Sequence, residues 1–209
     1  MVSPSLIFLN KETSVVSLPK FITAQKLLED KLIIEFPSIE NDDNQRIRLR
    51  RIVELTVGDI ACIVKPHTDL VCDTIVRGIL PKRHNGLESP TVYVLVTDNK
   101  FDFYNITEIA DKKYQILNRV LENVIVKRIF TIYQLADFLN RDLEKDIKKY
   151  NSKLVIITGD FFLHSDSQIS KEGKDWFYPQ MIKAIKKVKD SIILVFSPTK
   201  LSSLINYNT

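Results

Sequence analysis

The sequence predicts an α/β fold in which a doubly wound, mostly parallel sheet is flanked by helices. Stretches rich in β-branched residues alternate strictly with stretches that carry apolar residues at helical spacing, and this order is typical of parallel sheets. The strand-like stretches are almost continuously apolar, as expected where helices cover both faces. With 209 residues, of which 44% are hydrophobic and 27% charged, the chain can bury such a core.

The first 50 residues are expected to form an N-terminal extension, made of a short strand, a helix and a basic strand, that packs on a core of residues 51–209. Residues 15–18 are apolar and predict the short strand. Residues 21–32 carry apolar side chains at helical spacing and predict the helix. A polar break at residues 41–45 separates this helix from the basic strand.

Two further strands and a helix are predicted next. Residues 46–57 and 60–64 are rich in β-branched residues, and Gly58-Asp59 between them is a turn signal, so the strands are expected to pair as a hairpin. Residues 69–80 place apolar side chains on one helical face. Pro81 ends that helix because proline lacks an N–H.

Short apolar strands and amphipathic helices alternate over the rest of the chain, and this alternation carries the prediction of a parallel sheet. The strands are expected at residues 92–96, 124–126, 154–158 and 192–196, and the helices at 106–118, 131–150 and 178–188.

The charge balance does not identify a partner. The chain has 30 Lys and Arg against 26 Asp and Glu, a net charge of +4, which is small for a dedicated nucleic-acid binder. No apolar stretch approaches the roughly 20 residues of a membrane span, and the N-terminus lacks the features of a secretory signal. We therefore expect a cytoplasmic protein.

The cysteines and histidines do not predict a metal site. Cys62 and Cys72 form no C-x-x-C pair and are expected to be small buried side chains. His67, His84 and His164 lie far apart in the sequence, without a metal-binding spacing. No metal and no cofactor are expected.

A set of short motifs carries a resemblance to a known family. The motifs are Leu80-Pro81, Gly86-Leu87, Val92-Tyr93, Asp98-Asn99-Lys100-Phe101, Arg128-Ile129-Phe130, Gln134-Leu135 and Gly159-Asp160. Their order and spacing over residues 52–198 resemble the RecA family of recombinases, which includes archaeal RadA and RadB and the eukaryotic recombinase paralogues. The resemblance implies a RecA-like ATPase core.

The same resemblance implies a degenerate phosphate loop. Counted back from Pro81, the family's G-x-x-x-x-G-K-[ST] falls on residues 61–68, and the matched positions include Ala61, Lys65, Pro66, His67 and Thr68. Only Thr68 keeps the family residue type. Glycine N–H groups and a lysine normally hold the phosphates, whereas proline has no N–H and histidine is shorter and mostly neutral.

A second register starts the phosphate loop at Gly58, and its G-K positions would then fall on Ile63-Val64. This alternative is no better, because neither residue supplies a glycine N–H or a lysine. Under either register we expect a loop that does not hold a triphosphate.

The acidic positions of the ATPase centre are displaced as well. By the resemblance, the catalytic glutamate falls on Thr97, or on Asp98 in a second register. The Walker B aspartate falls on Thr158, with Asp160 two residues further on. We therefore expect a RecA-like protein that does not hydrolyse ATP.

Two further segments are candidate binding sites. Phe21 and Ala24 have the Phe-x-x-Ala spacing with which recombinases dock into a neighbouring subunit, although an amphipathic helix packed on its own core gives the same pattern. Two basic clusters are candidate DNA contacts, or alternatively solvated surfaces. They comprise Arg46, Arg48, Arg50 and Arg51 on a strand, and Lys183, Lys186 and Lys187 on the last helix.

Aromatic groups are expected near the carboxyl ends of the strands, where open α/β sheets bind ligands. They lie at residues 101–104, 161–162 and 176–178, and they either pack in the core or form a partner surface.

The leading hypothesis is a catalytically inactive RecA-fold paralogue that acts as an accessory protein in homologous recombination and DNA repair. Its expected partner is a recombinase or another RecA-family paralogue. One alternative is an ATP-dependent enzyme whose site is completed by a partner subunit. A second is a stand-alone DNA-binding module. The sequence leaves the partner's identity and the oligomeric state open.

Overall fold

The computed structural model describes residues 6–9, 30–36, 51–64, 66–96, 102–159 and 171–197. Within these ranges six strands form one sheet, in which every pair of neighbours is parallel. The strand order is β1 (Leu6–Leu9), β4 (Ile60–Val64), β8 (Ile192–Ser197), β7 (Leu154–Gly159), β5 (Thr91–Val96) and β6 (Val124–Ile129). The predicted α/β class is confirmed, as are the four strands predicted at residues 92–96, 124–126, 154–158 and 192–196.

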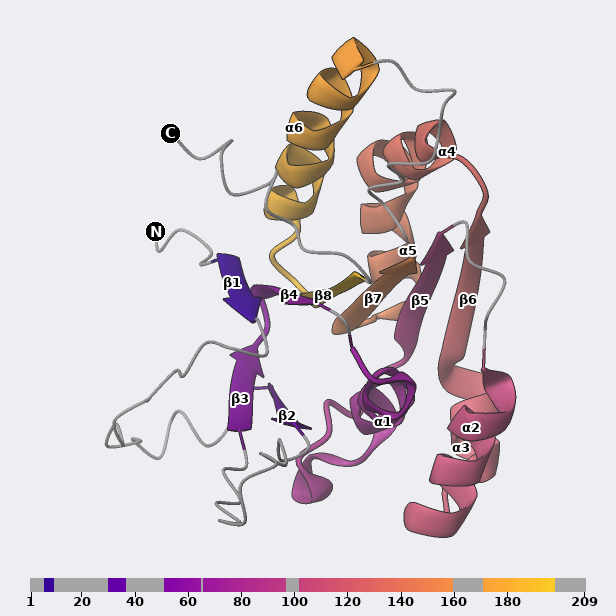
Figure 1. Cartoon of the computed structure of the whole chain (residues 1–209). Helices are drawn as coiled ribbons and strands as arrows, with labels where there is room; N and C mark the ends of the chain where they lie inside the picture. The colour runs from indigo at the N-terminus through magenta and orange to yellow at the C-terminus, as the bar shows by residue number, and fades with distance from the viewer. Residues whose placement is uncertain are drawn as a thin grey trace, which may run out of the picture.

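Helices cover both faces of this sheet (Figure 1). One face carries α1 (Thr68–Ile79), α2 (Phe103–Glu108), a π-helical turn (Ile109–Lys113) and α3 (Leu117–Asn123). The other carries α4 (Ile132–Asp137), a second π-helical turn (Phe138–Asp142), α5 (Leu143–Tyr150) and α6 (Lys171–Lys187). A short 3₁₀ helix (Lys82–His84) follows α1.

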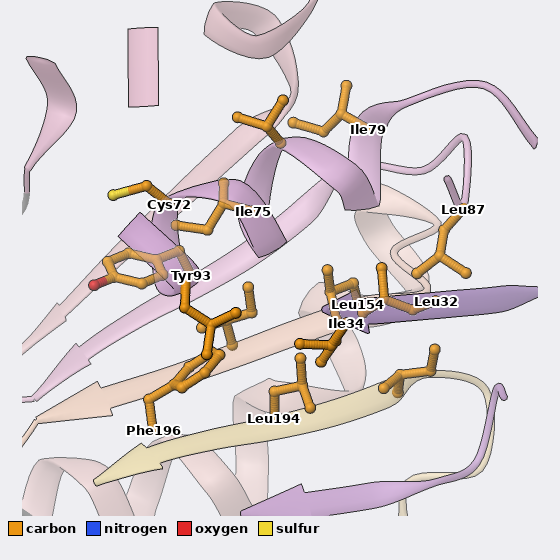
Figure 2. Close-up of a cluster of buried hydrophobic side chains, with 14 of the residues drawn as sticks. Leu32, Ile34, Cys72, Ile75, Ile79, Leu87, Tyr93, Leu154, Leu194 and Phe196 are labelled. Carbon is orange, nitrogen blue, oxygen red and sulfur yellow. The ribbon is translucent and has the colours of Figure 1, made fainter. Parts of the chain in front are cut away.

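Alternate residues of each strand enter two separate cores, because successive side chains of a strand point to opposite faces. In β5, Val92 and Val94 pack with α4, α5 and α6, whereas Tyr93 packs with α1. In β7, Leu154 is fully buried on the α1 side (Figure 2). Because both faces of the central strands are buried, their sequences are almost continuously apolar.

A small antiparallel ribbon, β2 (Lys31–Phe36) and β3 (Arg51–Thr56), packs on the α1 side of the sheet. Leu32, Ile34 and Leu55 of the ribbon are at most 1% exposed and lie in that core. Figure 2 shows Leu32 and Ile34 there. The predicted helix over residues 21–32 is therefore wrong at its end. Leu32 and Ile34 point into the core two residues apart, which is strand periodicity, while residues 21–29 lie outside the described ranges.

The predicted hairpin between β3 and β4 is also wrong, although both strands form within residues 51–64; residues 46–50 of the first predicted strand lie outside the described ranges. Gly58 adopts a positive φ of 98° and its N–H donates to the Ser191 carbonyl, so the chain turns into the parallel sheet. The Asp59 carboxylate holds this turn by accepting from the Thr56 N–H (2.7 Å). β3 pairs with β2 instead of with β4.

The other helix predictions hold with three differences, one of which is that α6 begins at Lys171, seven residues before the start of the helix predicted over 178–188. α1 ends at Ile79, directly before Leu80-Pro81, as predicted. The predicted helix over residues 106–118 is broken between the first π-helical turn and α3, where Gln115 takes a φ of 56°. The predicted helix over residues 131–150 is helical from Ile132 to Tyr150 but includes the second π-helical turn.

The described parts of the first 50 residues contact the core directly. β1 pairs with β4 in the main sheet. The Asp30 carboxylate, just before β2, forms ion pairs with Lys82 (2.6 Å) and Lys153 (2.7 Å). None of the helices in the described ranges is long and apolar enough to cross a membrane.

Candidate functional site

The carboxyl ends of β5 and β7 form the switch point of the sheet. These strands are neighbours, yet the chain leaves β5 toward α2 on one face and β7 toward α6 on the other (Figure 1). Ligands of open α/β sheets bind in the crevice that such diverging connections create. The carboxyl edge is therefore the candidate functional site.

The two strands are held close together at this point. The Tyr93 hydroxyl and Thr158 Oγ1 share a hydrogen bond of 2.7 Å between β5 and β7. Gly159 has a φ of 134°, and a Cβ on it would lie 2.0 Å from the Val96 carbonyl oxygen. Only glycine fits there, because other residues rarely adopt this φ and a Cβ would collide with backbone.

The connection from β4 to α1 is short. Ala61 and Ile63 are buried within β4, which runs to Val64, and α1 begins at Thr68. Only residues 65–67 remain to connect strand and helix, and Lys65 among them lies outside the described ranges. A phosphate loop needs a longer, glycine-containing turn whose N–H groups curl around the phosphates.

The second register of the phosphate loop, which begins at Gly58, conflicts with the structure. Gly58 lies before the amino end of β4, and Ile63 and Val64 are strand residues. In this register most residues of the loop would belong to strand β4 itself. The loop would also begin at the amino edge of the sheet instead of the carboxyl edge.

The start of α1 carries its own negative charge. Asp69, in the first turn, lies 3.6 Å from His67 Nδ1 and accepts a hydrogen bond from the Asn105 side chain (2.9 Å). Asp102 caps α2 by accepting from the Asn105 N–H (3.0 Å). These carboxylates occupy the partly positive helix ends, so a further anion there would meet like charge.

The remaining predicted site residues divide into two groups. Thr97, Asp98, Asp160, Phe21, Ala24, Arg46, Arg48 and Arg50 lie outside the described ranges, and Arg51 is the first residue of β3. Lys183, Lys186 and Lys187 lie on α6, where Lys183 and Lys187 are exposed and Lys186 is half-buried.

Both cysteines are buried, as predicted. Burial raises the pKa of the Cys62 thiol to about 12. Burial, with the carboxylates Asp102, Asp69 and Asp73 nearby, raises that of Cys72 to about 12 as well. Both therefore remain thiols near neutral pH and supply no nucleophile.

A cluster around Asp73 was not predicted from the sequence. Its carboxylate accepts from Arg77 Nε (2.6 Å), Lys113 Nζ (2.6 Å) and the Tyr114 hydroxyl (3.2 Å), which ties α1 to the first π-helical turn. Burial alone would raise the Asp73 pKa, but these cations hold it below its ordinary value. The i, i+4 spacing of Asp73 and Arg77 was the only sequence signal of this cluster.

Exposed aromatic side chains follow the carboxyl ends of β5 and β6. Tyr104 is 77% exposed, Tyr133 66% and Phe130 62%. The predicted aromatic group on α6 is split between surface and core, because Trp176 is 59% exposed and Phe177 is buried. Phe130 and Tyr133 were not predicted as surface residues; the only local signal was the polar residue that follows each of them, Thr131 and Gln134.

Within the described ranges, no group of three or more His, Cys, Asp or Glu side chains is arranged to hold a metal ion. Comparison with protein-family models and with curated proteins gives no match for this sequence. The resemblance to the RecA family therefore remains a prediction.

Proposed function

We propose that this protein is a RecA-fold paralogue without ATPase activity that acts as an accessory protein in homologous recombination and DNA repair. It would do so by binding a recombinase or another RecA-family paralogue. The observation that carries the proposal is the short connection between β4 and α1, which has no glycine and includes Pro66.

The electrostatics of this connection support the loss of nucleotide binding. Phosphate sites at helix N-termini depend on N–H groups and on the absence of competing anions. Here Asp69 stands in the first turn of α1, and Asn105 fixes its side chain from α2. A triphosphate would have to displace this pair and approach a carboxylate.

The packing of the matched motifs supports the family assignment. Leu80 and Leu87 are at most 2% exposed, and they flank the turn that leads from α1 to β5. A Cβ on Gly86 would lie 2.1 Å from the Leu80 carbonyl oxygen, so the turn needs glycine. Tyr93 follows on β5. Helix, turn and strand occur in the order that the resemblance requires.

Action by protein binding is supported by the exposed aromatic residues at the carboxyl edge. Tyrosine and phenylalanine are enriched at protein interfaces, where a few large side chains supply most of the binding energy. Tyr104 and Tyr133 follow the carboxyl ends of neighbouring strands and are more than half exposed.

The proposal is tested by affinity purification from the host lysate, with and without nuclease, followed by mass spectrometry. Recovery of a recombinase or a RecA-family paralogue despite nuclease supports it. Loss of every partner on nuclease treatment, or recovery of metabolic enzymes alone, contradicts it.

The contact is then measured with the purified partner. Tyr104→Ala and Tyr133→Ala are expected to weaken binding about tenfold each, as for interface anchors. Lys112→Ala, a change at an exposed residue of the first π-helical turn, serves as the control. Phe21→Glu separately tests the predicted docking motif.

A further inference from the structure

Four residues of α6 lie along one line of the helix surface. Glu172, Trp176, Lys183 and Lys187 fall within about 60° of one another, at about 100° per residue. Trp176 is 59% exposed, and both lysines are exposed as well. The opposite side of the helix supplies buried apolar residues to the core. We call these four positions the outer line of α6.

The outer line is acidic at its amino-terminal end and basic at its carboxyl-terminal end. Glu172 stands at one end and Lys187 at the other, about 22 Å apart along the helix axis. Lys171 and Lys174 are close to Glu172 in the sequence but lie at least about 100° away from the line. The outer line therefore carries opposite charges at its two ends.

The lysines of the outer line are available to a partner. Among the residues that the structure describes, neither Lys183 nor Lys187 forms an ion pair. The pKa of Glu144 on α5 is lowered mainly by its hydrogen bond to Lys148 (2.6 Å), and Lys187 contributes least to that shift. Both ammonium groups can thus meet a carboxylate or an aromatic ring of another molecule.

We propose that two copies of this chain associate through antiparallel α6 helices. The two-fold axis passes next to Pro179, which is exposed. Each Glu172 then faces the partner's Lys187 in an ion pair. Each Trp176 faces the partner's Lys183 in a cation–π contact. Both contacts form twice, because an interface of this symmetry repeats every contact.

The charges select this arrangement over the alternatives. Parallel helices would place each Glu172 beside the partner's Glu172 and each Lys187 beside the partner's Lys187, and these like charges repel. An antiparallel register shifted by one turn would pair Glu172 with the partner's Lys183. It would also leave Lys187 beyond the start of the partner helix and Trp176 without a cation. The proposed register satisfies all four positions.

The interface is small, so the association is expected to be weak. α6 has 17 residues and is about 25 Å long, which places a single helix pair below the roughly 1,200 Å² of a stable complex. We expect a dimer that is populated at about 100 μM and dissociates on dilution. It should also weaken as salt is added, because its ion pairs lie at the surface.

This inference does not rest on the proposed function. It uses neither the β4–α1 connection nor the carboxyl-edge aromatic residues, and it is separate from the docking motif of Phe21 and Ala24. A chain that fails to bind a recombinase could still pair through α6. Conversely, a chain that stays monomeric could still act as an accessory protein, so the two proposals fail separately.

A charge exchange between two variants tests the register. Glu172→Lys and Lys187→Glu each place like charges opposite each other at both ion pairs. In sedimentation equilibrium of the full-length protein at low salt, we expect each variant alone to dimerise at least about tenfold more weakly than wild type. An equal mixture of the two should recover dimerisation, because each introduced charge then faces an opposite one. The double variant Glu172→Lys/Lys187→Glu should recover it alone.

Two further variants complete the test. Trp176→Ala is expected to weaken dimerisation about tenfold, as for an interface anchor. Lys112→Glu reverses the same charge as Lys187→Glu, but on the opposite side of the sheet, and should leave dimerisation unchanged. Circular dichroism verifies that each variant folds.

Three results would overturn the proposal. The first is a wild-type chain that remains monomeric at about 100 μM and low salt. The second is dimerisation of both single variants at the wild-type strength, or an equal loss in Lys112→Glu and Lys187→Glu. The third is loss in both single variants with no recovery in their mixture or in the double variant, since that would exclude the antiparallel register.

Discussion

The amino and carboxyl edges of the central sheet are built from different kinds of residue. At the amino edge, buried serine hydroxyls tie neighbouring strands together. Ser191 Oγ donates to the Ser152 carbonyl (2.7 Å), Ser152 Oγ donates to the Pro90 carbonyl (2.8 Å), and Ser89 Oγ accepts from the Lys153 N–H (2.7 Å). The three serines are at most 4% exposed.

The carboxyl edge is joined at fewer points among the described residues and carries exposed aromatic side chains. β5 and β7 meet through Tyr93 and Thr158 and through Gly159, while Tyr104 and Phe130 extend into solvent. Among the described residues, the buried hydrogen bonds that maintain the fold therefore gather at the amino edge, and under the proposed function the carboxyl edge is the binding edge. This division is common in α/β proteins, whose sites lie beyond the carboxyl ends of the strands.

The largest effect is expected at the point where the carboxyl edge is tightest. Gly159→Ala places a Cβ against the Val96 carbonyl at a φ that alanine disfavours. We expect a loss of about 2–4 kcal/mol in the free energy of unfolding, measured by urea denaturation. Gly58→Ala, whose Cβ would meet its nearest atom at 3.4 Å, is the control and should cost less. Equal costs would contradict close backbone contact between β5 and β7.

Removing a buried hydroxyl from the amino edge is expected to have the next largest effect. Ser191→Ala deletes a donor and leaves the Ser152 carbonyl in a dry environment, which should cost about 1–3 kcal/mol. Thr68→Ala removes an exposed hydroxyl at the carboxyl edge and should change stability by less than about 0.5 kcal/mol. Similar losses in the two variants, measured by thermal unfolding, would remove the distinction between the edges.

The Asp30 ion pairs should make the amino edge sensitive to acid. Burial raises the pKa of this carboxyl, but Lys153 and Lys82 more than offset it, so the folded-state pKa lies below the ordinary value of 3.8. A depressed pKa contributes stability above the unfolded-state pKa and loses it as the pH falls through the folded-state pKa. The wild-type protein should therefore exceed Asp30→Asn in melting temperature at pH 7, with the difference shrinking below about pH 4. A difference in melting temperature that stays constant with pH would mean that the charge of Asp30 does not contribute to stability.

The smallest effect on stability is expected for the exposed aromatic residues. Tyr133→Ala should change the free energy of unfolding by less than about 0.5 kcal/mol, because two thirds of the side chain is already in water. A loss above about 2 kcal/mol would show that Tyr133 packs in the fold and is unsuited to a partner surface. The measurement is the same urea titration.

The sequence predicted the central strands well and the N-terminal ribbon poorly. β5 and β7 are buried on both faces, so their sequences are continuously apolar and predict strands clearly. In β2, Leu32 and Ile34 alternate with a two-residue period, but the preceding residues have helical spacing, and the helix prediction was extended over Leu32. The pairing of β3 with β2 instead of β4 depends on contacts between distant segments, which a turn signal cannot reveal.

The candidate site was predictable in position but not in detail. Aromatic residues near the strand ends were expected, yet adjacent positions such as Trp176 and Phe177 separate into exposed and buried only when the helix docks on the sheet. The Tyr93–Thr158 hydrogen bond joins residues far apart in the sequence. The spacing from Pro81 placed the loop on residues 61–68, whereas residues 61–64 belong to β4 and Thr68 to α1, so only residues 65–67 connect the two elements.

The most direct test of the account is an equilibrium titration of the purified chain with fluorescent ATP and Mg²⁺, followed by an assay for phosphate release. The short connection between β4 and α1 and the Asp69 carboxylate at its end predict no saturable binding at micromolar nucleotide and no release above the buffer rate. Micromolar binding with turnover would contradict the loss of the nucleotide site.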